Sequence, residues 1–154
     1  MIEIELTSTE NVVEVLRKLN KGIKRRKPLM RAIAGTMESA VLQNFESGGR
    51  PPWQGLKYRQ GTPLVDTENL MASIDSTHDN DNAMVGTNVV YAAIHQFGGV
   101  IKPKEGKYLT FKIGDKWVKT KEVNIPARPF LKLTPEDEED ILQDVQDYFQ
   151  SIIK

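Results

Sequence analysis

The segment from 85 to 99, VGTNVVYAAIHQFGG, constrains the fold more than any other stretch of the chain. It has no charged side chain, and glycines near both of its ends interrupt regular structure. The pattern predicts the end of a strand, a turn in which Asn88 caps a helix, one or two helical turns, and a glycine exit. Tyr91, Ile94 and Phe97 lie three residues apart, which predicts that they share one helix face and point into the protein.

Hydrophobic periodicity predicts strands and helices in the rest of the chain. The alternation over 1–6 is typical of a half-buried strand, and Ser8 or Thr9 is expected to cap the next helix. Helical spacing then covers 12–23 and 29–45, and Asp66 or Thr67 is expected to cap a short helix. Two hairpins are expected, 73–78 with 83–86 and 109–113 with 116–123. Thr134 and Pro135 begin a last helix, whose expected buried face is Ile141, Leu142, Val145, Tyr148, Phe149 and Ile152.

These elements predict an α+β fold. We expect a single domain over 1–154, in which one antiparallel-rich sheet is packed by N-terminal and C-terminal helices. The segment 48–63 contains three prolines and four glycines, and it is expected to form a long mobile loop. Loops of this length in a small domain are usually functional or mobile.

Composition argues against most kinds of chemistry. The chain has no cysteine, which excludes disulfides, thiolate metal sites and a cysteine nucleophile. His78 and His95 are its two histidines, and neither has a second ligand at the spacing of a metal site. Phosphate-binding glycine motifs are absent, no apolar run has the length of a membrane span, and the N-terminus has no signal-peptide pattern. We therefore expect no enzymatic activity and no cofactor.

A catalytic arrangement of Ser73, His95 and Asp66 can be imagined, but the sequence has no Gly-x-Ser-x-Gly elbow to support it. The favoured interpretation of His95 is a partly buried residue whose ring hydrogen-bonds the backbone.

Charge is unevenly distributed along a chain whose formal net charge is +0. The basic segment 17–31 holds eight Lys or Arg and no acid, and the acidic segment 136–147 holds seven acids and no base. Such a chain can pair its own ends or stack head to tail with other copies. The basic segment is also a candidate for contact with nucleic acid, although it lacks the interleaved aromatic residues that stack on bases.

Four blocks in order resemble the phage virion morphogenesis family of Mu-like tail-completion proteins. They are Pro52-Trp53-Gln54-Gly55-Leu56, the block 64–74, the segment 85–99, and Ile125-Pro126-Ala127-Arg128-Pro129-Phe130-Leu131. The family usually has glycine where this chain has Glu68 and Lys132. The resemblance implies a structural protein that completes the tail and prepares it for head joining, as a homo-oligomeric ring that contacts tail-tube and head-connector proteins. It also implies a location in the virion tail, and in the cytoplasm of the bacterial host during assembly.

Six residues are candidates for an assembly interface: Trp53, Arg25, Arg26, His95, Gln96 and Arg128. Trp53 has two interpretations of equal weight, an interface hot spot or a side chain folded back on the core. Pro129 restricts Arg128 to an extended conformation, from which it can reach a neighbouring carboxylate or end a strand.

Overall fold

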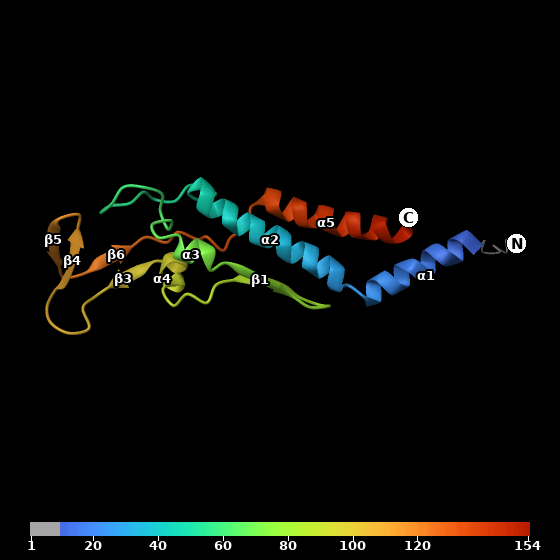
Figure 1. The fold of residues 1–154 in the computed structure, drawn as a ribbon, viewed down its shortest axis with the longest axis horizontal. Helices are drawn as coiled ribbons and strands as arrows, with labels where there is room; N and C mark the ends of the chain where they lie inside the picture. Colours follow the sequence, from blue (N-terminus) through green and yellow to red (C-terminus); the bar gives the residue numbers. More distant parts are fainter. Residues whose placement is uncertain (1–9) are drawn as a thin grey trace, which may run out of the picture.

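A long central helix organises the molecule. The computed structural model describes residues 10–154, so the strand expected at 1–6 and its following cap at Ser8 or Thr9 lie outside the described residues. The central helix α2 (Lys27–Ser47) packs against α5 (Pro135–Ile153) on one side, and it contacts the hairpin of β1 (Asp75–His78) and β2 (Ala83–Gly86) as well. The whole is elongated, with α1 (Glu10–Lys24) extending from one end (Figure 1).

Local sequence signals account for the end of α2 and the start of α5. Gly48 adopts a left-handed conformation, with φ of 76°, and its N–H bonds to helix carbonyls, so α2 ends where the glycines begin. The start of α5 is a capping box, as expected from Thr134 and Pro135: Thr134 Oγ1 accepts from the N–H of Asp137, and the Asp137 carboxylate accepts from the N–H of Thr134.

Antiparallel pairing is confirmed, but it is divided among three two-stranded ribbons rather than gathered in one sheet. The first is β1–β2. The second joins β3 (Gly99–Ile101) to β6 (Val123–Ile125), and the third joins β4 (Leu109–Ile113) to β5 (Lys116–Thr120). The strand expected at 116–123 therefore ends at Thr120, and Val123 pairs instead with Ile101. The β4–β5 hairpin forms the end of the molecule opposite to α1 (Figure 1).

The core lies where three parts of the chain meet: α2, the two short helices Asn69–Ala72 and Ala92–Phe97, and residues 125–131, which we call the C-terminal block. It contains Val41, Phe45, Leu70, Ile74, Ala92 and Phe130. The rings of Phe45 and Phe130 are 5.2 Å apart, and both residues are fully buried. Within residues 10–154, none of the helices combines the length and apolar character that crossing a bilayer requires.

Three local predictions are wrong. The short helix α3 (Asn69–Ala72) has no side-chain cap from Asp66 or Thr67, and it follows Glu68, whose φ of 60° is left-handed. Asn88 does not cap α4 (Ala92–Phe97), since that helix begins after Tyr91 and has no side-chain cap. Leu142 of α5 is exposed, whereas the other five residues of its expected buried face are partly buried.

Candidate functional site

The signature segment presents apolar side chains to solvent, contrary to the prediction that Tyr91, Ile94 and Phe97 point inward together. Val90 is 97% exposed and Phe97 is 79% exposed, and Tyr91 and Val100 are exposed as well. We call these four residues the signature patch. The inward side of α4 is formed by Ala92, which is buried, while Ile94 is half-buried. A group of exposed large apolar side chains on one short helix and its flanks is typical of a protein interface.

Backbone and side-chain contacts hold α4 rigidly against the C-terminal block. The Gln96 side chain donates to the Leu131 carbonyl at 3.3 Å and accepts from the Leu131 N–H at 2.9 Å. The N–H of Arg128 donates to the His95 carbonyl at 2.7 Å. Gly98 has φ of 72°, and a Cβ there would lie 2.8 Å from the backbone nitrogen of Ala127, so this approach requires glycine. The signature patch is thus carried on a fixed support.

A cavity of about 500 Å³ lies beside α4. The loop 48–63, α3, α4, β4 and β6 contribute to its lining, and among the lining residues are Tyr58, Arg59, Asp66, Tyr91, His95, Phe111 and Arg128. His95 and Asp66 share this cavity, but Asp66 is exposed and pairs with Arg59 at 3.9 Å. Ser73 lines a different cavity, and its hydroxyl bonds the Leu70 carbonyl and Thr87. The imagined triad is therefore not assembled.

His95 is partly buried, as expected, but its Nδ1 is buried without a hydrogen-bond partner instead of bonding the backbone. Burial and the nearby positive charge of Arg128 lower the pKa of His95 below its ordinary value of 6.5. The ring packs edge-on against Tyr91, with centroids 5.9 Å apart. The described residues contain no cluster of histidine and carboxylate side chains that could hold a metal ion.

Trp53 and Arg128 attach the loop 48–63 to the body of the protein. Trp53 packs edge-on against Phe45 at 6.0 Å, which favours its interpretation as a side chain folded onto the core. Arg128 is only 6% exposed, and its guanidinium donates to the carbonyls of Gln54 at 2.9 Å and Gly55 at 3.0 Å. It forms no ion pair with a carboxylate in the described part of the chain.

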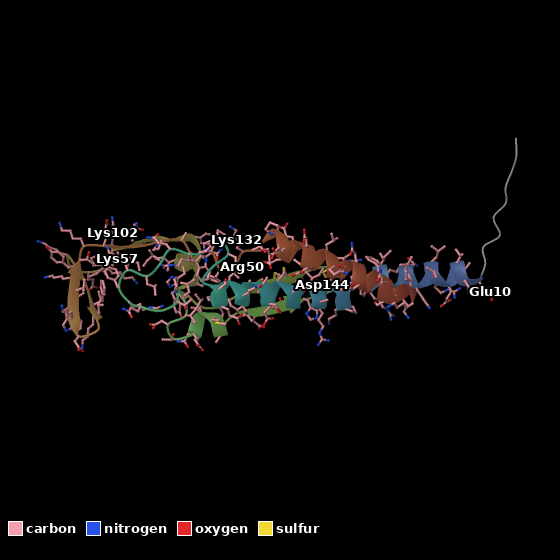
Figure 2. The ribbon with its side chains drawn as sticks, turned by 90° about the horizontal axis from the view of Figure 1, so that it is seen from above. Glu10, Arg50, Lys57, Lys102, Lys132 and Asp144 are labelled. Carbon is pink, nitrogen blue, oxygen red and sulfur yellow. The ribbon has the colours of Figure 1, made fainter. Side chains whose placement is uncertain are left out.

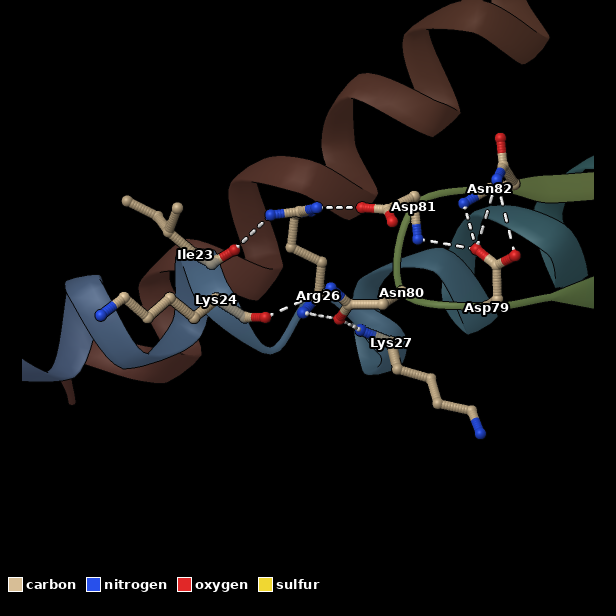
Figure 3. Close-up of polar contacts among 8 residues, drawn as sticks. All are labelled: Ile23, Lys24, Arg26, Lys27, Asp79, Asn80, Asp81 and Asn82. Carbon is tan, nitrogen blue, oxygen red and sulfur yellow. Dashed lines mark hydrogen bonds and ion pairs between the residues drawn. The ribbon is translucent and has the colours of Figure 1, made fainter.

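The basic residues Arg25 and Arg26 lie between α1 and α2, and the turn of the β1–β2 hairpin contacts Arg26 (Figure 3). Asn80 accepts from the backbone N–H groups of Arg26 at 2.7 Å and Lys27 at 3.2 Å, so a distant residue caps the start of α2. The Arg26 guanidinium pairs with Asp81 and donates to the Ile23 carbonyl. The Arg25 side chain is exposed. Of these two cations, Arg25 is the one that faces outward.

A buried polar network that the sequence analysis missed joins α2, the loop and α5. Arg50 donates to both carboxylate oxygens of Asp137, at 3.0 and 2.8 Å, to Asn44 Oδ1 at 2.7 Å and to the Ala40 carbonyl at 2.8 Å. Asn44 in turn donates to the carbonyls of Phe130 and Lys132. Burial raises the pKa of Asp137, but hydrogen bonds from Arg50 and Thr134 outweigh it and hold the pKa below its ordinary value. The sequence offers one indication of this network: Arg50 stands between two glycines and two prolines, where the chain leaves α2.

Sequence comparison links this chain to phage virion morphogenesis. The model of the phage virion morphogenesis family matches residues 7–150. A Haemophilus influenzae protein described as Mu-like prophage FluMu G protein 2 is 58% identical over 154 residues, which is the full length of both chains. A protein of Escherichia phage Mu described as putative capsid assembly protein G is 25% identical over 139 residues, 80% of each chain. No solved structure matches the chain.

Proposed function

The chain belongs to the phage virion morphogenesis family, and on that premise we propose that it is a tail-completion protein acting at the junction of tail and head. The exposed signature patch carries the proposal. Val90, just before α4, and Phe97, at the end of α4, are large apolar side chains exposed to water, and the Gln96 side chain fixes this helix to the backbone of Leu131. Covering these side chains with another subunit would be favourable, because it removes apolar surface from water.

An assembly role without a chemical step agrees with the cavity beside α4. A nucleophile activated by a base needs the two groups within hydrogen-bond reach. Here Ser73 is bonded elsewhere, and Nδ1 of His95 has no hydrogen-bond partner among the described residues. In this proposal the protein acts by binding other subunits, through buried surface area and shape complementarity at their interfaces.

Charge supports contacts between copies of the chain. Among residues 10–154, no ion pair joins the basic segment 17–31 to the acidic segment 136–147. Both segments are left able to meet opposite charge on a neighbouring copy. Exposed Leu16 and Ile23 on α1 add apolar area beside the basic residues. A head-to-tail contact of this kind closes into a ring if the rotation between copies permits it.

The proposed neighbours are the tail tube and the head connector, and the proposed location is the virion tail after assembly in the host cytoplasm. The name of the Escherichia phage Mu relative refers to capsid assembly. A protein at the head–tail junction contacts both halves of the particle, which is compatible with that name.

The test replaces Val90 and Phe97 together with glutamate in the phage or prophage that encodes the chain. Both side chains are exposed, so folding should be retained, with a change of only ~0.5 kcal/mol for each substitution. We expect heads and tails to accumulate unjoined in electron micrographs of the lysate. Met84→Glu, an exposed apolar residue outside the signature patch, is the matched control and should leave joining intact. Normal joining in the double variant would remove the patch from the interface.

A further inference from the structure

The β4–β5 hairpin carries an unusual combination of positive charge and exposed aromatic rings. The hairpin together with its flanking segments, residues 102–122, contains seven lysines and three acids, which leaves a charge of +4 in a chain that is neutral overall. All seven lysines are exposed. The hairpin lies at the far end of the molecule from α1, so it is well separated from the basic segment 17–31 (Figure 1).

Strand register divides the hairpin into two faces. Phe111 and Val118 are opposite each other on the inner face, where Phe111 packs against Tyr58 at 5.4 Å. The outer face carries the opposed pair Lys112 and Trp117 and the opposed pair Thr110 and Lys119. Trp117 is 71% exposed.

Other cations and an aromatic ring lie at the hairpin end of the molecule. Lys119 lies over the ring of Tyr108, with its Nζ 4.5 Å from the ring centroid, so Tyr108 belongs to the same face. Lys102 and Lys57 lie at the same end of the molecule as the hairpin (Figure 2). Among residues 10–154, Lys102 is the one lysine of the hairpin region that forms an ion pair, with Glu122 at 4.0 Å. The positive charge of the outer face is thus available to an external partner.

We propose that the outer face of the β4–β5 hairpin binds double-stranded DNA. A two-stranded antiparallel ribbon fits the major groove of a duplex, and lysines along its face and edges can reach the phosphates on either side. An acidic protein surface is a less suitable partner for this lysine-rich face than DNA is, because lysine is depleted at the centres of protein–protein interfaces. The basic segment 17–31 is a poorer candidate for DNA, because Arg26 is engaged by Asp81 and the segment has no aromatic residue.

The experiment measures binding of the full chain to a short fluorescein-labelled DNA duplex by fluorescence anisotropy, over a salt titration. For duplex DNA the logarithm of the binding constant falls with the logarithm of salt concentration, with a slope of about −0.9 per phosphate contact. Lys112→Gln combined with Lys119→Gln should weaken binding about tenfold and reduce the slope by about 1.8. Trp117→Ala should weaken binding without changing the slope, because the indole carries no charge.

The matched control, Lys21→Gln combined with Lys24→Gln, removes the same charge from exposed positions on α1 and should bind DNA like the wild type. Equal losses in the control and hairpin variants would overturn the proposal, as would wild-type binding that does not depend on salt. Sedimentation velocity distinguishes a protein partner. If the hairpin variants dissociate an oligomer and leave DNA binding unchanged, the outer face contacts an acidic surface of another copy instead. Failure of DNA binding leaves the head–tail joining assay unaffected, so the two proposals fail independently.

Discussion

The network around Arg50 should contribute more to stability than any other ion pair among residues 10–154. The Arg50→Ala substitution removes four hydrogen bonds. It leaves the buried carboxylate of Asp137 without its cation, with one hydrogen bond from the Thr134 N–H, and it leaves Asn44 Oδ1 without the Arg50 donor. The Asp137 side chain is only 5% exposed, so solvent cannot replace the lost contacts. Removing one partner of a buried ion pair typically costs about 3–5 kcal/mol. We expect the free energy of unfolding to fall by about that amount.

Urea denaturation followed by far-ultraviolet circular dichroism measures this loss, since α2 and α5 both depend on the network. Arg50→Lys retains the charge but not the planar fork, and it should lie between the wild type and the alanine variant. Arg17→Ala is the matched control, because its pair with Glu14 has similar length but is exposed, and it should cost less than about 1 kcal/mol. A loss below about 1 kcal/mol in Arg50→Ala would refute the reasoning.

Acid provides a second check on the same pair. The folded-state pKa of Asp137 lies below its unfolded value, so the stability from its ionised form is complete above the unfolded pKa. That stability is lost as pH falls through the folded pKa, because the unfolded chain takes up the proton first. The difference between wild type and Arg50→Ala should therefore shrink in acid. A difference that stays constant across this range would contradict the assignment of the pair.

Three further outcomes are expected. Phe130→Ala should lower the free energy of unfolding by about 3–5 kcal/mol, because Phe130 is fully buried, whereas exposed Phe97 should cost only ~0.5 kcal/mol when changed to alanine. Chemical denaturation measures both losses, and equal losses would contradict the assignment of Phe130 as buried and Phe97 as exposed. Because the pKa of His95 is lowered in the folded protein, thermal stability should fall as pH drops below about 6.5 and level off below the folded pKa. His95→Gln should flatten this part of the curve of melting temperature against pH, and an unchanged curve would argue against a buried, neutral ring. Arg128→Met removes the hydrogen bonds to the carbonyls of Gln54 and Gly55 and should loosen the loop 48–63 locally. Trypsin should then cut after Lys57 faster than in the wild type, by more than the measured change in the free energy of unfolding accounts for. An unchanged cutting rate would show that other contacts hold the loop.

Sequence reasoning succeeded where the signal is local. The cap at Thr134, the break between α1 and α2, and the hairpin turn at 79–82 are each specified by a few adjacent residues. The family preference for glycine at position 68 also has a local explanation, because Glu68 adopts a left-handed conformation with φ of 60°.

The orientation of α4 shows why spacing alone was insufficient. Tyr91, Ile94 and Phe97 do share helical spacing, but a helix of six residues is oriented by what its neighbours hold rather than by its own pattern. Gln96 pairs with the backbone of Leu131, and buried Ala92 allows α4 to approach the core closely. These contacts turn Phe97 outward.

Long-range polar contacts were not predictable from the sequence either. Arg50 and Asp137 lie 87 positions apart, and Arg26 and Asn80 lie 54 apart. No periodicity or motif links such residues, since only the folded chain brings them together. Among the candidate interface residues, Arg128, Gln96 and Arg26 contact other segments of the same chain, whereas Arg25 remains exposed.

The most direct measurement of the proposed role is electron microscopy of lysates from the encoding phage after deletion of this gene. A tail-completion protein predicts full heads and separate tails in the same lysate. Adding the purified wild-type chain should then join them into complete particles. Joined particles without the protein would contradict the account, and so would a lysate that lacks heads, since that result would place the protein in capsid assembly.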